Sequence, residues 1–184
     1  MFEIINKIRQ QIGDKFNKLK NVRPSQKQWK NLDSVQNIVI VSDITPIETE
    51  KAIVSLRGEL KKICPNSKVM MISYYDKKVR TDINNFVSNQ GIVEYFTDDD
   101  ISFFYKITSD SLKSYLSDDY DMAIMIAKGE KPYLPYIFRY VRAALRIGNK
   151  VTNDGKMNFV INTITRNPDD LNKEILKYLK MFFS

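Results

Sequence analysis

The chain has 184 residues, of which 43% are hydrophobic and 28% charged, a balance typical of one globular domain and not of a disordered chain. It contains no histidine, which excludes Ser-His-Asp and Cys-His catalysis and the common histidine-containing zinc sites. Its single cysteine, Cys64, excludes an internal disulfide.

Positive charge is concentrated near the N-terminus. The net charge of the chain is +7, and residues 1–30 contain eight basic and two acidic residues. Residues 1–30 therefore carry +6 and the rest of the chain is nearly neutral. Such asymmetry indicates an N-terminal segment that binds an anionic partner, either nucleic acid or a membrane surface. The alternative is a solvated helix face that aids solubility.

Residues 2–20 have the periodicity of an amphipathic helix. Five apolar residues form one stripe, namely Ile5, Ile8, Ile12, Phe16 and Leu19. The candidate surface-binding residues are basic: Lys7 and Lys18 lie opposite the stripe, and Arg9, Lys15 and Lys20 flank it. The helix is expected to pack on its own domain, to join a second copy or another protein, or to dock on a membrane surface. Residues 21–34 are expected to form a linker, which divides the chain into an arm (1–34) and one α/β domain (35–184).

The location expected from the sequence is the cytoplasm. No apolar run approaches the ~18–20 residues that span a bilayer. Charges interrupt the first residues every few positions, so a secretory signal peptide is not expected either. The lone Cys64 fits a reducing compartment.

Strands and helices alternate along the rest of the chain. The predicted strands are 37–41, 68–75, 92–96, 122–126, a short one after 146–148, and 158–162. The predicted helices are 46–62, 109–116, 132–145 and a last one after Asn167 to about residue 182. For the first of these, Thr45 and Glu48 are expected to form a capping box around Pro46. The pattern predicts a three-layer Rossmann-like sandwich with a mostly parallel sheet of five or six strands, in an order such as 3-2-1-4-5.

Ligands of open α/β sheets bind at the carboxyl ends of the strands where the strand order reverses. The candidate ligand-binding residues there are Ser42, Asp43, Thr45, Lys128 and Gly129, which suit a nucleotide or nucleotide-sugar. The turn of residues 42–48 has no glycine for a phosphate loop, so helix capping is the competing interpretation.

Two acidic groups resemble candidate ligands of a divalent cation: Asp98, Asp99 and Asp100, and Asp118, Asp119 and Asp121. No calcium-loop spacing is present, and helix capping and turn formation explain both groups more simply. No catalytic residue, metal or cofactor is therefore expected. Whether the protein is an enzyme stays open, and the sequence favours a protein without catalytic activity.

Three segments carry a resemblance to known proteins: NIVIVSD, YDMAIMIAKGEKPYLPYIFRYVRAALRIGNK and NFVINTITRNPDDLNKEILKYLKMF. Over nearly the whole chain they resemble an uncharacterised family common in Bacteroidales-type bacteria, which implies an architecture and no activity. The middle segment is also similar to the N-terminal half of heptosyltransferase-like glycosyltransferases, with Tyr120-Asp121 opening and 143–148 closing the unit. Met125 replaces an acid of that pattern, and 184 residues leave no room for the donor-binding half.

The function expected from the sequence is a non-catalytic binding or interaction module. One alternative is a nucleotide or nucleotide-sugar binding protein related to half of a glycosyltransferase. The other is attachment of the basic N-terminal helix to an anionic surface, lipid or nucleic acid, which is compatible with either.

Overall fold

The computed structural model describes residues 2–16, 31–79, 93–127, 133–149, 157–161 and 167–183. In chain order the described elements are α1 (Phe2–Phe16), the 3-10 turn η1 (Leu32–Ser34), β1 (Asn37–Asp43), α2 (Ile47–Ile63), β2 (Lys68–Tyr74), β3 (Val93–Phe96), the 3-10 turn η2 (Asp98–Asp100), α4 (Asp110–Ser117), β4 (Asp119–Ile126), α5 (Tyr133–Phe138), β5 (Arg142–Gly148), β6 (Phe159–Val160) and α6 (Pro168–Phe183).

The described strands form one all-parallel sheet of six strands in the order β3-β2-β1-β4-β5-β6. The predicted order 3-2-1-4-5 is confirmed, and β6 extends it at the edge. The central strands are short apolar runs because both of their faces are covered. Residues 38–41 of β1 are completely buried, with Val39 and Val41 on one face and Ile38 and Ile40 on the other.

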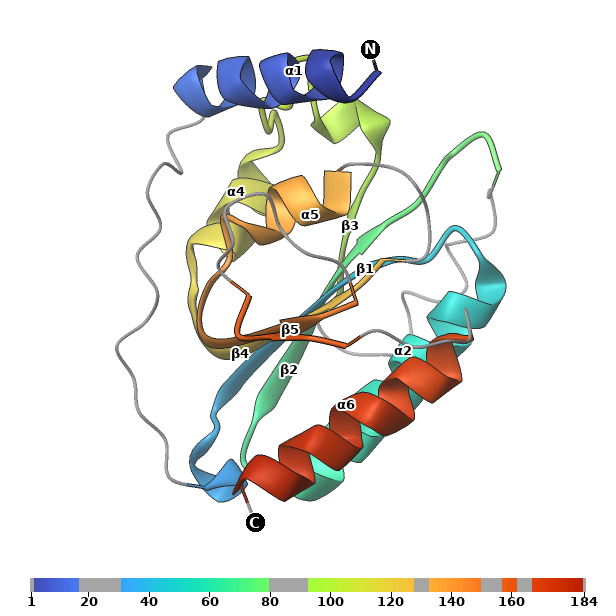
Figure 1. Ribbon diagram of the computed structural model, residues 1–184, viewed down its shortest axis with the longest axis vertical. Helices are drawn as coiled ribbons and strands as arrows, with labels where there is room; N and C mark the ends of the chain where they lie inside the picture. Colours follow the sequence, from blue (N-terminus) through green and yellow to red (C-terminus); the bar gives the residue numbers. More distant parts are fainter. Residues whose placement is uncertain are drawn as a thin grey trace.

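Helices cover both faces of the sheet, so the predicted three-layer architecture is confirmed. α2 and α6 lie side by side on one face, where Leu56 and Ile175 enter the core (Figure 1). α4 and α5 contribute Leu112 and Ile137 to the core on the opposite face. α1 crosses the outside of this second helix layer, above α5 (Figure 1).

Local capping chemistry sets several element boundaries as the sequence indicates. Ser109 Oγ accepts a hydrogen bond from Leu112 N at 3.2 Å and begins α4. Asn167 Oδ1 accepts from Asp169 N at 3.0 Å at the start of α6. A capping box of Thr97 and Asp100 begins η2, so the acidic group 98–100 is a helical turn as predicted.

The predicted helix 132–145 is wrong beyond residue 138. α5 ends at Phe138, and β5 begins at Arg142 and pairs with β4. Leu145 therefore enters the core on the α2–α6 face, whereas a helix through residue 145 would place it on the same side as Val141, which faces the other layer. The alanine- and leucine-rich sequence favours a helix, but pairing with β4 outweighs that weak preference.

The predicted capping box at α2 is also wrong. The N-cap residue is Pro46, and no side chain caps the helix there. Thr45 Oγ1 instead accepts a hydrogen bond from Asp76 N at 3.0 Å, which joins the end of β1 to the segment after β2. Thr45 and Glu48 thus have the sequence spacing of a capping box, but the Thr45 hydroxyl is hydrogen-bonded to a different segment.

Candidate functional site

The reversal of strand order lies between β1 and β4, where Ser42 is paired with Ile126. Ser42 is buried, and its hydroxyl lies 3.2 Å from that of Ser73 on β2. Asp43 is 6% exposed, and its Oδ1 accepts a hydrogen bond from Thr45 N at 3.0 Å. These polar atoms bind other parts of the same chain at the end of β1, as a turn requires.

The structure thus brings Ser42, Asp43 and Thr45 together, whereas Lys128 and Gly129 lie outside the described residues. The ligand site at this position stays a prediction. A feature that the sequence did not reveal closes the end of β4: the side chain of Asn149 donates to Ala127 O and accepts from Ala127 N, both at 2.8 Å.

The N-terminal helix offers a second candidate site, because it contacts the body through its polar side. Asn6, Arg9, Gln10 and Gly13 follow the i, i+3, i+4, i+7 spacing of one helix face. Gln10 is only 8% exposed, and Asn6 and Arg9 are partly buried. The helix thus packs on its own body, one of the alternatives left open by the sequence, but through its polar side and not through Ile5 and Ile8 of the apolar stripe.

Arg9 connects α1 to the loop of residues 101–107. Its Nε donates a hydrogen bond of 2.7 Å to Phe103 O. Its guanidinium carbon lies 4.1 Å from the ring centroid of Phe103 and 4.7 Å from that of Tyr105. A planar, charged guanidinium satisfies all three contacts at once, since it stacks on aromatic faces and donates in its own plane.

Tyr105 fixes the loop 101–107 to the body of the protein. Its φ of 57° is in the left-handed region, which costs a residue with a side chain roughly 1–2 kcal/mol. The side chain is fully buried, with ring centroids 5.0 Å from Tyr136 and 5.7 Å from Tyr133, and its hydroxyl donates to Asn6 Oδ1 at 3.3 Å. Burial raises the pKa of the Tyr105 hydroxyl despite the opposing effect of the Arg9 charge.

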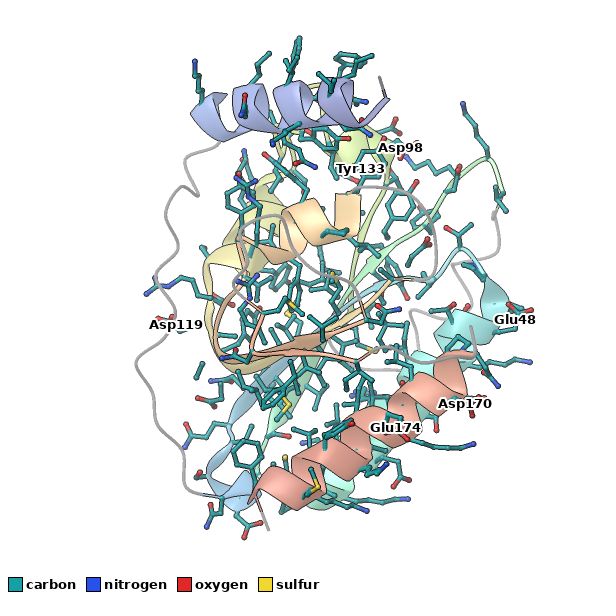
Figure 2. The ribbon with its side chains drawn as sticks, viewed as in Figure 1. Glu48, Asp98, Asp119, Tyr133, Asp170 and Glu174 are labelled. Atoms are coloured by element: carbon teal, nitrogen blue, oxygen red, sulfur yellow. The ribbon has the colours of Figure 1, made fainter. Side chains whose placement is uncertain are left out.

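Aromatic contacts continue from this anchor to the carboxyl end of β2. The Tyr133 ring lies 5.7 Å from that of Tyr74, the last residue of β2. The Tyr74 hydroxyl donates to Asp98 Oδ1 at 2.8 Å, and Figure 2 shows Tyr133 and Asp98 close together beneath α1. The loop 101–107 and the α5 tyrosines Tyr133 and Tyr136 thus form a platform under α1. This platform contacts the sheet and η2, so its position is set by the core of the protein.

The outer side of α1 exposes apolar residues. Ile4 is 65% exposed, Ile8 50% and Ile5 48%, and Figure 2 shows side chains of α1 extending away from the rest of the protein. Phe103, the residue under Arg9, is 65% exposed as well. We call these four residues, Ile4, Ile5, Ile8 and Phe103, the outer apolar surface. Of the rest of the predicted stripe, Ile12 is partly buried, and neither the side chain of Phe16 nor Leu19 is among the described parts.

The candidate surface-binding residues divide between described and undescribed segments. Lys7 and Lys15 are exposed on α1, whereas Arg9 faces the body. Lys18 and Lys20 lie outside the described residues. Sequence reasoning missed the docking role of Arg9, Gln10 and Gly13, although a glycine inside a helical pattern is a signal of close packing.

The acidic residues 118–121 have structural roles. Asp121 is 4% exposed, and its Oδ2 accepts from Gln36 N at 2.7 Å and Asn37 N at 2.9 Å, which holds the start of β1. Asp119 pairs with Arg142 on β5 at 3.1 Å. Within the described ranges no three Cys, Asp or Glu side chains gather in a metal-binding group, and no helix there is long and apolar enough to cross a bilayer.

A protein-family model matches residues 9–182. The chain belongs to the family of unknown function DUF6913. The matched range includes Arg9, Gly13 and the whole α/β body, so the expected membership of an uncharacterised family is confirmed. No curated protein and no solved structure matches the chain, and the comparisons give no support to the expected bacterial distribution or to a heptosyltransferase likeness.

Proposed function

We propose that this protein is a non-catalytic interaction module and that the outer apolar surface of α1 and Phe103 is where it binds. One observation carries the proposal: α1 uses its polar side to dock on the body and leaves Ile4, Ile5 and Ile8 exposed. A helix that served only to complete the core would present these residues inward. We also propose that it acts in the cytoplasm, which the unpaired, buried Cys64 supports.

The rigidity of the platform supports the same function. Arg9 is held between a carbonyl oxygen and two aromatic rings, and the loop that carries Phe103 is closed by the antiparallel bridge of Ile101 and Ile107. A surface fixed before binding loses little conformational entropy when a partner arrives. The polar atoms of Asp43 and Thr45, by contrast, bond within the chain, which is what a structural turn requires.

Thiol labelling tests whether the outer apolar surface is covered where the protein works. Cys64 is fully buried, and burial raises the pKa of its thiol to about 11, so the native cysteine reacts slowly. The variant Ile4→Cys places a reactive thiol on the surface, and Val79→Cys places one at a position that is 71% exposed on the body.

The expected result is protection of one site only. In cells that produce the chain, Ile4→Cys should be modified several-fold more slowly than in the purified protein, while Val79→Cys reacts equally in both. Equal rates for Ile4→Cys in cells and in pure solution contradict an interaction function for this surface.

A further inference from the structure

We infer that the outer apolar surface binds an anionic lipid bilayer, with α1 lying in the plane of the headgroups while it stays docked on the body. The inference rests on the proposed function and names the partner. Its surface comprises Ile4, Ile5 and Ile8 of α1 together with Phe103 of the loop 101–107.

The geometry suits a bilayer surface. Ile4 and Ile8 are one helical turn apart on the same face, opposite the docked side that includes Gln10 and Gly13. α1 lies along the outside of the protein (Figure 1). Its isoleucines are exposed on the side away from the body, which is the orientation in which amphipathic helices enter the headgroup region. Phe103, in the loop on which α1 rests, is a further exposed apolar residue, and the guanidinium carbon of Arg9 lies 4.1 Å from its ring centroid.

The charge distribution selects an anionic surface. Residues 1–30 carry a net charge of +6, whereas the remaining sequence carries +1. Two of the basic side chains, Lys7 and Lys15, are exposed on α1. Anionic lipids attract basic residues near the membrane, and the isoleucines add a contact that salt does not screen.

Other partners fit this combination less well. A second copy would place two segments 1–30, each with a net charge of +6, beside each other, and like charges oppose that contact. Nucleic acid would satisfy the lysines through its phosphates but would leave Ile4 and Ile8 in water. A bilayer interface satisfies both groups together.

Vesicle binding of the full chain tests the inference. We expect the protein to bind vesicles of phosphatidylglycerol and phosphatidylcholine and to bind phosphatidylcholine vesicles much less. Ile8→Ser should weaken binding by about tenfold or more, because one inserted isoleucine is lost. The matched control is Ile47→Ser in the first turn of α2, where the side chain is 49% exposed compared with 50% for Ile8. It should bind like the original protein.

A fluorescent label shows which part of the protein meets the lipid. An environment-sensitive fluorophore on Ile4→Cys should shift its emission to the blue with anionic vesicles, and the same label on Val79→Cys should not. Exchange of both Lys7 and Lys15 for glutamine should reduce the preference for anionic over neutral vesicles.

Failure of the lipid inference and failure of the proposed function are distinguishable. Absence of binding to anionic vesicles, or equal binding by Ile8→Ser, overturns the lipid inference. If Ile4→Cys is nevertheless protected in cells, the proposed interaction function holds and the surface binds a different partner. A dimer in solution would identify that partner as a second copy, and salt-sensitive binding to RNA or DNA would identify it as nucleic acid. If Ile4→Cys is unprotected as well, both proposals fail.

Discussion

Gly13 and Phe104 approach so closely that a Cβ atom at residue 13 would lie 2.0 Å from the Phe104 carbonyl oxygen. The same atom would lie 2.9 Å from the hydroxyl oxygen of Tyr136 on α5. Because the first of these neighbours is backbone, it cannot rotate away. The absence of a side chain at residue 13 is therefore what lets α1 rest on the loop 101–107.

Gly13→Ala should loosen the docking of α1 on the body. Alanine favours a helix over glycine by roughly 0.5–1 kcal/mol, but the added methyl group clashes with the Phe104 carbonyl. We expect faster amide hydrogen exchange throughout α1 and little change in the sheet. The matched control is Gly58→Ala in α2, where nothing lies within 4 Å of the new methyl group, so the same substitution should be stabilising. Slower exchange in α1 of Gly13→Ala would contradict the close contact.

Arg9→Ala should also release α1, through the loss of one hydrogen bond and two ring contacts. The expected cost to docking is about 1–3 kcal/mol. Arg9→Lys should recover only part of it, because an ammonium group cannot stack and donate in one plane. Amide hydrogen exchange in α1 measures how much each of these two variants weakens the docking. Lys7→Ala on the exposed side of the same helix should leave exchange unchanged, and an equal effect of the two alanine variants would count against the Arg9 contacts.

Asp121→Ala should strongly destabilise the fold. The change leaves the backbone N–H groups of Gln36 and Asn37 without their carboxylate acceptor, at an expected cost of about 2–3 kcal/mol. Asp119→Ala, two residues earlier on β4, removes a half-exposed ion pair with Arg142 and should cost less than about 1 kcal/mol. Urea unfolding compares the two, and similar midpoints would show that the Asp121 contacts contribute little.

Stability should fall on the alkaline side because of Cys64. Burial raises the pKa of this thiol from its ordinary value of 9.0 to about 11. Above pH 9 the unfolded chain releases the thiol proton while the folded chain retains it, so the free energy of unfolding decreases until about pH 11. Urea unfolding across this range should show a smaller slope for Cys64→Ala than for the original chain. Identical slopes would show that Cys64 does not contribute to the pH dependence.

The fold was predictable because its signals are local. Runs such as residues 37–41 and 122–126 are too short and too uniformly apolar for surface helices, and Ser109 and Asn167 mark helix starts by their own side chains. Alternation of these elements restricts the topology to a parallel, doubly covered sheet. The predicted ligand site at the carboxyl ends of β1 and β4 follows from that order alone.

Two local sequence patterns led to wrong predictions. Thr45 and Glu48 have the spacing of a capping box, and residues 139–145 have the composition of a helix. In the structure Thr45 bonds to Asp76 and Arg142 pairs with Asp119, both of which are distant in sequence. A propensity of a few tenths of a kcal/mol is easily outweighed by such pairings.

By itself, the sequence predicted the parallel strand order and the two helix layers through the alternation of strands and helices, and the amphipathic character of residues 2–16 through the periodicity of one short segment. Only the tertiary structure decided which side of α1 faces the body. Hydrophobic periodicity predicts an apolar side turned inward, but the loop 101–107 and α5 offer a carbonyl oxygen, stacked rings and a place for a bare glycine backbone. That platform matches Arg9 and Gly13, and the isoleucines remain exposed as a result.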